Sequence, residues 1–543
     1  MEIEVKNLDH LGIVAGIIDQ IGLVEEIDRQ IKTHPQQIIT TGVVVKAMIL
    51  NGLGFVSAPL YLFGEFFQGK ATEHLLGEGI KPEHLNDDRR ARALDSLWNQ
   101  GLSPLFTSMA MLAKERFEVT TESLHLDSSS FSVEGSYENK SDDESGESGE
   151  LGESVEEITI TYGYSKDHRP DLKQFLMDVI CTGDGDVPLF IRIADGNEAD
   201  KGVFAQLMRE FKQQWNLEST YVADSALYSA KNIQQLGELC WISRAPLNLS
   251  AARVLLESVS EEAFGESEIP GYRIAPCCSK YGEVPQRWLV IESEQRRHSD
   301  LKHLEKRLQK QLTNAQKKLN ALNKQDFSCA ADALQAAQKL NKIWRYHRLD
   351  ALEIQACPHY NKAGRPAKNQ SPDHCSYRIQ AQVVTRDEAI QLARRRAGRF
   401  ILATNVVDEN ILGDNEVLKE YKGQQSAERG FRFLKDPLFF TSSVFLNTPR
   451  RVAALAMVMG LCLLVYTLGQ RQLRRALVQA GETIPNQLNK PTATPTLRWV
   501  FQCFQAVHLV ILGSQVQISN LTHNRLLILR FLGSPCQKYY LLS

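Results

Sequence analysis

The sequence lacks a dominant charge of either sign. Its 543 residues carry 62 lysines and arginines against 65 aspartates and glutamates, a formal net charge of −3. The net charge therefore does not indicate a nucleic-acid partner, and nucleic-acid binding has to be argued from local clusters of basic residues. With 43% apolar and 23% charged residues, the composition excludes wholesale disorder and a fibrous repeat. At about 150 residues per domain, the length predicts three or four domains.

Cysteine is present, but it forms no framework. Of the ten cysteines, only Cys277 and Cys278 are neighbours, and no C-x-x-C pair occurs. This pattern excludes a disulfide scaffold and fits a reducing compartment. The first residues are charged and mixed rather than an apolar leader, so we expect a cytoplasmic protein.

One group of residues raises the question of a metal. The two cysteines and two histidines concerned are Cys357, His359, His374 and Cys375. Their C-x-H and H-C spacings fit no usual zinc pattern. Free thiols and loop histidines are the favoured interpretation, with a zinc site as the alternative.

A single long apolar run stands at residues 452–470 (VAALAMVMGLCLLVYTLGQ). Nineteen uncharged residues are just long enough to span a bilayer. Arginines flank both ends, however, so the positive-inside bias favours neither side. A helix buried on all sides in a large protein has the same composition. We favour the buried helix and expect no membrane contact; a membrane anchor is the alternative.

The first 115 residues are predicted to be helical, because apolar residues recur at three- and four-residue spacing. Residues 84–88 (HLNDD) are predicted to form a loop with a cap that opens the next helix. This region is expected to bind DNA or to dimerise.

Alternation of apolar and polar residues begins near residue 120. Residues 122–133 are predicted as a strand, followed by an acidic surface loop at 134–157 that is too polar to fold. Three further strands are predicted at 158–164, 173–181 and 187–193, the last two joined by the turn TGDGD.

A helix, a strand, a helix and a strand follow. The helix begins after Asn197, and the strand TYVA ends at Asp224. Three antiparallel strands followed by these elements predict a mixed sheet covered by helices. In such a sheet the first and fourth strands are neighbours.

Residues 247–397 interrupt this pattern. They include a long amphipathic helix, and from Arg296 to Lys324 the chain has nine basic residues and two acids. A solvated helical hairpin is the favoured interpretation, and an arm that contacts phosphates is the alternative. Residues 394–396 (RRR) add a second basic cluster. Strand-like residues 398–405 and a helix at 416–435 follow.

Three carboxylates stand out by their positions. Asp127 lies on the first strand, Asp224 at the end of the fourth, and Glu428 on the later helix. If the strands are neighbours and the helix packs across them, the three side chains converge. Three hard oxygen ligands suit Mg²⁺ or Mn²⁺, and two such ions support phosphodiester cleavage.

The helix that carries Glu428 has two faces. Tyr421, Glu428 and Lys435 are seven residues apart, so they share one side, together with Gln424, Gln425 and Arg432. An apolar stripe forms the other side: Ala427, Phe431, Leu434 and Leu438. Such a helix buries one face and presents a carboxylate between polar groups to a phosphate backbone. Glycines at 423 and 430 each cost about 1 kcal/mol in a helix interior, which indicates that a backbone approaches closely there.

Residues 421–435 (YKGQQSAERGFRFLK) resemble the Tyr-Arg-Glu-Lys signature of bacterial insertion-sequence transposases with a DDE active site. Tyr421, Glu428 and Lys435 fit its spacing, and Gln424 stands where the signature has Arg. Segments 126–128 and 222–228 resemble those around the family's two aspartates. Further blocks, 163–171 and 195–197, and the helical N-terminus are also similar, so the resemblance covers roughly residues 120–470.

The resemblance implies an α/β fold: a ribonuclease H-like mixed sheet with flanking helices, interrupted by an insertion domain, after an all-helical N-terminal domain. The implied domains are 1–115, helical; 116–246, first part of the catalytic core; 247–397, insertion domain with a basic helical hairpin; 398–480, second part of the core carrying Glu428; and 481–543, a C-terminal closing element.

The resemblance also implies the chemistry. Asp127, Asp224 and Glu428 would be catalytic and hold two Mg²⁺ or Mn²⁺ ions. Cleavage at transposon ends and strand transfer into target DNA would be in-line phosphoryl transfers. Tyr421, Gln424, Arg432 and Lys435 are the candidate DNA-binding residues. A homodimer on paired DNA ends, associated with the nucleoid, would be the working unit. The alternative is a catalytically inactive, transposase-derived DNA-binding or regulatory protein.

Overall fold

The computed structural model describes residues 3–32, 37, 39–55, 63–137, 157–165, 169–198, 200–361, 371–436, 446 and 448–542. The chain divides into two compact units. The first comprises Met1–Ser243, Gly282–Val284 and Leu418–Ser543, and the second comprises Arg244–Tyr281 and Pro285–Val417.

A mixed sheet forms the centre of the first unit, with its strands in the order β4-β3-β2-β5-β6. β2 pairs with β3, and β3 with β4, in antiparallel fashion, whereas β5 is parallel to both β2 and β6. The predicted order is confirmed for the strands at 122–133, 173–181 and 187–193 and for the helices and strands that follow them. The elements are β2 (Ser123–Val133), β3 (Lys173–Thr182), β4 (Pro188–Ala194), α8 (Asp200–Trp215), β5 (Thr220–Ala223), α9 (Ala230–Leu236) and β6 (Trp241–Ala245).

The prediction of a strand at residues 158–164 is wrong. Thr161 makes a single isolated bridge with Gln174, and no strand is assigned between 157 and 165. The side-chain amide of Gln174, the bridge partner, donates to Gly196 O at 2.6 Å, and residues 157–165 form a loop here. Most of the acidic loop predicted at 134–157 lies outside the described residues.

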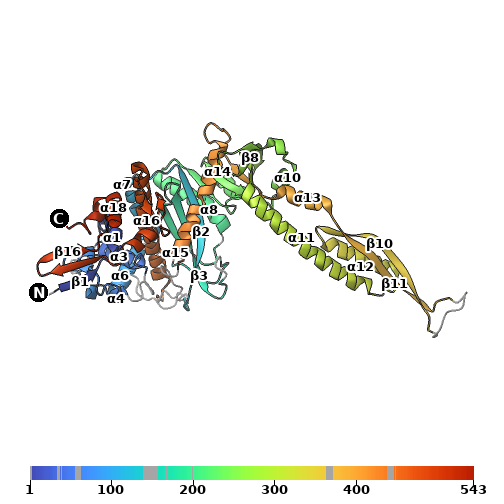
Figure 1. Ribbon diagram of the computed structural model, residues 1–543, viewed down its shortest axis with the longest axis horizontal. Helices are drawn as coiled ribbons and strands as arrows, with labels where there is room; N and C mark the ends of the chain where they lie inside the picture. Colours follow the sequence, from blue (N-terminus) through green and yellow to red (C-terminus); the bar gives the residue numbers. More distant parts are fainter. Residues whose placement is uncertain are drawn as a thin grey trace, which may run out of the picture. The chain divides into compact units, whose positions relative to one another are not determined.

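Helices surround the sheet of the first unit (Figure 1). The predicted cap at residues 84–88 is confirmed, because the Asn86 side chain accepts a hydrogen bond from Arg89 N and α6 begins at Asp87. The N-terminal elements are β1 (Ile3–Asn7), α1 (Leu11–Ile21), α2 (Leu23–Gln30), α3 (Thr41–Gly52), α4 (Phe63–Phe66), α5 (Thr72–Leu76), η1 (Pro82–His84), α6 (Asp87–Gln100) and α7 (Leu102–Arg116).

The apolar run at 452–470 lies in the 32-residue helix α16 (Pro449–Ala480). Its most apolar window is long and apolar enough to cross a membrane, but 94% of that window is buried inside the structure, as the favoured interpretation predicts. α16 packs against α1, α3, α6, α7 and β4. Near its end, Arg471 donates to Asp184 Oδ1 at 2.8 Å and to Phe117 O at 2.9 Å, which ties α16 to the β3–β4 turn and to the end of α7.

The two ends of the chain pack together. β1 pairs with β15, and Gly16 of α1 lies against the backbone of Pro535 and Cys536. The sequence analysis missed this three-stranded sheet, β1-β15-β16. The C-terminal elements are β13 (Ile484–Pro485), β14 (Pro491–Thr492), α17 (Leu497–Cys503), β15 (His508–Leu512), β16 (Gln515–Ser519), α18 (His523–Leu532) and α19 (Ser534–Gln537).

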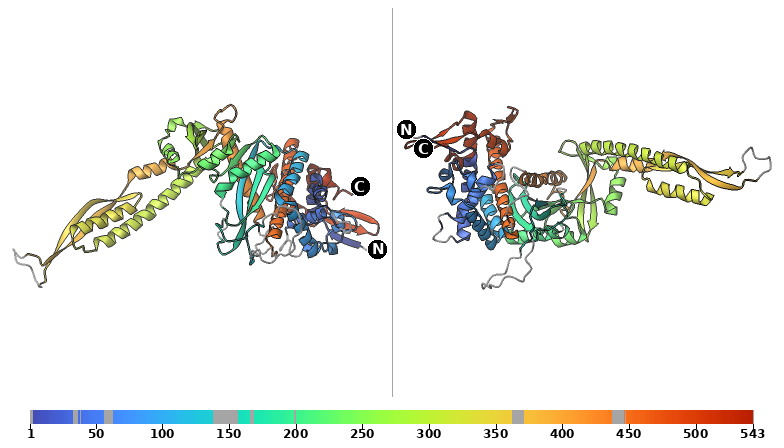
Figure 2. Two further views of the ribbon diagram at one scale, coloured as in Figure 1. Left: turned by 180° about the vertical axis from the view of Figure 1, so that it is seen from behind. Right: turned by 90° about the horizontal axis from the view of Figure 1, so that it is seen from below.

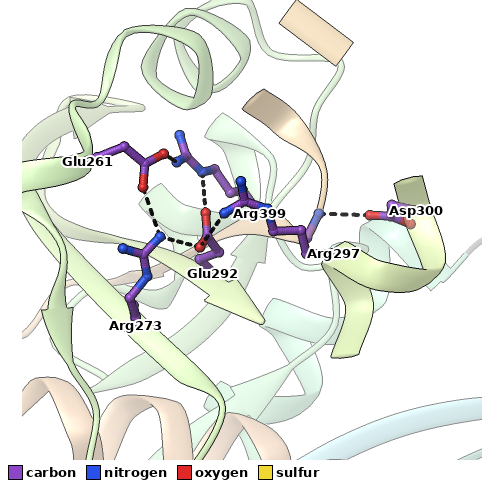
Figure 3. Close-up of polar contacts among 7 residues, drawn as sticks. Glu261, Arg273, Glu292, Arg297, Asp300 and Arg399 are labelled. Atoms are coloured by element: carbon purple, nitrogen blue, oxygen red, sulfur yellow. Dashed lines mark hydrogen bonds and ion pairs between the residues drawn. The ribbon is translucent and has the colours of Figure 1, made fainter. Parts of the chain in front are cut away.

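In the second unit, strands run in the order β12-β9-β8-β7. Glu292 on β9 is 5% exposed and accepts hydrogen bonds from Arg399 Nε at 2.8 Å, from Arg297 at 3.0 Å and from Arg273 (Figure 3). Glu261 pairs with Arg273 and Arg399, so a charge network around the buried Glu292 and Arg399 joins five elements of this unit. The elements are α10 (Ser250–Ser258), η2 (Glu261–Ala263), β7 (Gly265–Glu266), β8 (Tyr272–Tyr281), β9 (Val284–Ser293), α13 (Asp387–Arg396) and β12 (Arg399–Thr404).

The rest of the second unit is built on α11 (Glu294–Asn323), which runs beside α12 (Ala330–Ile343) and a two-stranded hairpin (Figure 2). The hairpin pairs β10 (His347–His359) with β11 (His374–Thr385). The helical pair was predicted, but the hairpin was not. His359 and His374 therefore lie in strands rather than loops, which corrects the sequence analysis. Their rings stack at 4.6 Å, and among the described residues neither belongs to a metal-holding group.

Candidate active site

Two of the three predicted carboxylates lie on neighbouring strands. β2 and β5 pair in parallel, with Leu126 opposite Ala223. Asp127 is the next residue on β2 and Asp224 is the first residue after β5. Since paired strands lie about 4.8 Å apart, the backbones of the two residues are neighbours. The prediction that these two strands are neighbours is confirmed. Their register and the direction of their pairing could not be predicted from either segment alone.

Backbone amides hold both carboxylates. Asp127 Oδ1 accepts from Ser128 N at 2.8 Å, and Asp224 Oδ1 accepts from Ala226 N at 2.8 Å. The Asp224 carbonyl in turn accepts from Ser243 Oγ on β6 at 2.8 Å. Asp224 is exposed and Asp127 is half-buried, so the pair lies at the surface end of the sheet.

The helix predicted at 416–435 is two helices. α14 (Asp414–Gly423) ends and α15 (Gln425–Leu434) begins around Gln424, whose N–H donates to Tyr421 O in a tight turn. The reason is close packing: a Cβ on Gly423 would lie 3.1 Å from His125 Cε1 of β2. A Cβ on Gly430 would lie 3.3 Å from Leu463 of α16. The nearest atoms at both glycines thus belong to side chains, and not to the backbone that was expected to approach closely there.

α15 packs along β2 (Figure 1). Gly423 contacts His125, and Phe431 lies 6.3 Å from the Phe131 ring. Because side chains alternate along a strand, His125, Asp127 and Phe131 point to one face. Glu428 lies between the two contacts on the helix, and its side chain is exposed.

The three carboxylates are nevertheless not assembled. Among the described residues, no three His, Cys, Asp or Glu side chains gather closely enough to hold a metal ion. Two aspartates are strand neighbours, and Glu428 lies on the helix above the same strand face without joining them. Their donor atoms are carboxylate oxygens, the ligands that Mg²⁺ and Mn²⁺ prefer, so the residues fit such an ion in kind.

The predicted DNA-binding residues lie in different surroundings. Arg432 is exposed, Tyr421 is half-buried, and Gln424 is 7% exposed. Lys435 Nζ lies 5.3 Å from the centre of the Phe131 ring. Leu438, predicted for the apolar stripe, lies outside the described residues, whereas Phe431 and Leu434 are buried as expected.

The sequence analysis missed His125. This fully buried residue lies two positions before Asp127, with Nε2 3.3 Å from Ser123 Oγ and 3.9 Å from Glu420 Oε2. Burial lowers the pKa of His125 to about 4. Its ring supports the turn at Gly423 and so positions α15. The alternation in LHLDS places it on the face of Asp127, a signal that was available in the sequence.

Arginines beside Glu428 were also missed. Arg429 pairs with Asp186 at 3.2 Å, and both line a cavity of about 380 Å³ at the β3–β4 turn. Arg474 lines the same cavity, and burial together with the charge of Arg429 lowers its pKa. The cavity is thus rich in guanidinium groups. No spacing in the sequence links residues 186, 429 and 474.

Two family models match successive parts of the chain. A family model described as "Transposase DDE domain" matches residues 124–466, and one described as "Domain of unknown function (DUF4277)" matches residues 3–111. No curated protein matches the chain. Among solved structures, a cryo-EM structure of piggyBac transposase synaptic complex with hairpin DNA is similar, with a TM-score of 0.38 and 8% identity over 93% of this chain and 83% of that one.

Proposed function

Because the match over residues 124–466 covers more than half of the sequence, the chain belongs to the transposase DDE domain family, and we propose that it moves an insertion sequence of the bacterial group with the Tyr-Arg-Glu-Lys signature. The reactions would be cleavage at transposon ends and strand transfer into target DNA. The core would be ribonuclease H-like, with residues 247–397 as an insertion domain and residues 1–115 as a helical DNA-binding or dimerising domain.

One observation carries the proposal: the parallel pairing of β2 with β5 in a register that makes Asp127 and Asp224 neighbours. A divalent ion that side chains share needs a second carboxylate at the same end of the sheet. A single Asp that follows a strand is usually only a turn residue. The packing of α15 along the same face of β2 supports Glu428 as the third group.

Asp127, Asp224 and Glu428 would hold Mg²⁺ or Mn²⁺. When bound, two such ions activate the nucleophile and stabilise the leaving oxygen. In cleavage, a water oxygen bonds to the scissile phosphorus and the P–O3′ bond breaks. One of the two new DNA ends then carries a 5′-phosphate, and the other carries a free 3′-hydroxyl. In transfer, that hydroxyl attacks a target phosphate in the same way.

Other residues of α14 and α15 would position the DNA. Tyr421, Arg432 and Lys435 lie along the helix pair and would contact phosphates, which orient DNA without reading its sequence. Gln424 is buried, so its contribution would be to the turn that sets the angle of α15. The working unit would be a homodimer on paired ends, in the cytoplasm with the nucleoid.

Metal-dependent nicking of DNA that carries the segments flanking the gene tests this function. We expect Asp127→Asn, Asp224→Asn and Glu428→Gln each to lower the nicking rate at least about 100-fold, because each removes charge stabilisation of the transition state. DNA affinity should stay within about threefold in the Glu428→Gln variant, since binding rests on cations.

Glu210→Gln, an exposed carboxylate on α8, is the matched control and should nick like the parent. Nicking by all three site variants at the parental rate would show that the assigned site is wrong. A second candidate, an inactive regulatory protein, is favoured by Gln424 in place of the signature arginine. It predicts tight binding of the same DNA with no nicking by the parent at any concentration of Mg²⁺ or Mn²⁺.

A further inference from the structure

Helix α11 of the second unit carries a row of lysines on its solvent side. We name this row the lysine stripe, and each of its members is exposed: Lys302, Lys306, Lys310, Lys317 and Lys324. The opposite side of the helix is buried against α12 and the β10–β11 hairpin through Leu304, Ala315 and Leu319. At about 100° per residue, the five lysines fall within about 50° of the direction opposite those buried residues.

The lysine stripe has no acidic partners. Among the described residues, none of its five ammonium groups lies within 4 Å of a carboxylate. α11 has one acid between residues 301 and 323, Glu305, which lies off the stripe. Solvated helices usually mix signs, because Glu–Lys pairs four residues apart stabilise them.

Like charges four residues apart instead destabilise a helix by about 0.2–0.5 kcal/mol per pair. Lys302, Lys306 and Lys310 form two such pairs. The stripe thus concentrates positive charge on the solvent side of the helix, which complements an anionic partner.

The length of the stripe matches duplex DNA. From Lys302 to Lys324 the helix rises about 33 Å, which is close to one turn of B-DNA, about 34 Å. We propose that the lysine stripe binds the phosphate backbone of duplex DNA over about one helical turn. This inference rests on the proposed function, because that function makes DNA the substrate. It assigns DNA to a surface outside the candidate active site.

The composition of α11 favours duplex DNA over other anions. The helix has no Phe, Tyr or Trp on which the bases of a single strand could stack. The stripe has no apolar side chain between its lysines that could enter a lipid surface. Lysine contacts phosphate as a point charge and reads no base, so the binding should be independent of sequence.

The test compares two double variants of the full-length protein. Lys306/Lys310→Gln removes two charges from the stripe, and Lys339/Lys342→Gln removes two exposed charges from α12 in the same unit. Affinity for a 30-base-pair duplex is measured between about 50 and 300 mM salt. We expect the stripe variant to bind about tenfold more weakly at 100 mM salt and the slope of log K against log salt to fall by about 2, or about 0.9 per lost phosphate contact.

The control variant should keep the parental slope, and Lys306/Lys310→Arg should restore it. An unchanged slope in the glutamine stripe variant would overturn the proposal, as would equal losses in both double variants. Loss of binding to anionic phospholipid vesicles without loss of DNA binding would assign the stripe to a membrane instead, and would also overturn it.

Nicking by the same proteins separates this proposal from the proposed function. At subsaturating DNA, the stripe variant should nick more slowly than the parent, whereas Lys339/Lys342→Gln should nick at the parental rate, because its carboxylates and its lysine stripe are intact. If the parent binds DNA through the stripe but never nicks it, the proposed transposase activity is wrong and the proposed DNA-binding role of the stripe is supported. If the parent nicks DNA and the stripe variant keeps the parental slope of log K against log salt, only the proposed DNA-binding role of the stripe is wrong.

Discussion

At the residue scale, His10 shows how burial in the first unit determines the protonation state of a side chain. His10 is 8% exposed, its Nε2 lies 2.8 Å from Leu53 O, and its ring stacks on Phe501 at 4.3 Å. Burial lowers the pKa of His10 to about 4 despite the hydrogen bond to Leu53, which raises it. The folded protein therefore holds this ring neutral.

His10 predicts a pH dependence of stability. The folded pKa lies below the unfolded value of about 6.5, so the unfolded chain takes up the proton first. The contribution is fully present above about pH 6.5 and is lost as the pH falls toward about 4. Between pH 8 and pH 5, His10 should account for about 2 kcal/mol of lost unfolding free energy.

Urea unfolding of the parent and of His10→Gln at both pH values measures this contribution, with β1 and α3 followed by hydrogen exchange. Glutamine keeps a donor for Leu53 O but does not titrate. The prediction fails if the two proteins lose the same free energy between pH 8 and pH 5.

Charge networks act at the scale of elements. In the second unit, β8, β9, β12 and the start of α11 meet at Glu292 (Figure 3). Burial alone would raise the pKa of this carboxyl, but hydrogen bonds from Arg273 and Arg399 outweigh burial and lower it. Arg399 is 3% exposed, so it depends on its acidic partners.

Glu292→Gln should destabilise the second unit by about 3 kcal/mol, because it removes the buried counter-charge of the Arg399 guanidinium and leaves it only the exposed Glu261 carboxylate. Hydrogen exchange of peptides from β9 and β12 under mild urea measures this, since it reports the second unit separately. Glu305→Gln, on the exposed side of α11, should change exchange by less than about 0.5 kcal/mol. Equal protection of β9 in both variants would contradict the role of Glu292.

At the scale of the whole molecule, contacts between distant segments close the first unit. A Cβ on Gly16 of α1 would lie 2.5 Å from Pro535 O and 2.6 Å from Cys536 Cα. Both neighbours are backbone, so neither can move aside without shifting α19. Nearby, Tyr539 Oη donates to Asp19 Oδ2 at 2.5 Å, which holds the same two elements together.

Gly16→Ala should therefore lower the unfolding free energy of the first unit by about 1–3 kcal/mol through overpacking. Gly202→Ala is the control, because nothing lies within 4 Å of the added Cβ in α8, and alanine favours a helix by up to about 1 kcal/mol. Thermal unfolding of both variants should give shifts of opposite sign. A neutral or stabilising Gly16→Ala would refute the close approach.

Local patterns in the sequence were enough to predict the strands and helices between residues 122 and 245 except the strand at 158–164, together with the cap at Asn86 and the burial of residues 452–470. Each depends on periodicity or composition within one segment, which neighbours along the chain determine. The candidate residues Asp127, Asp224 and Glu428 were reached partly from such positions and partly from a resemblance in the motif around Glu428.

Only the tertiary structure decided how these segments meet. The register of β2 with β5, the turn at Gln424 forced by His125, the pairing of β1 with β15, and the exposed position of Glu428 depend on contacts between residues up to several hundred positions apart. No pattern within a segment encodes them, because the free energy of such a contact belongs to both partners and to the packing around them.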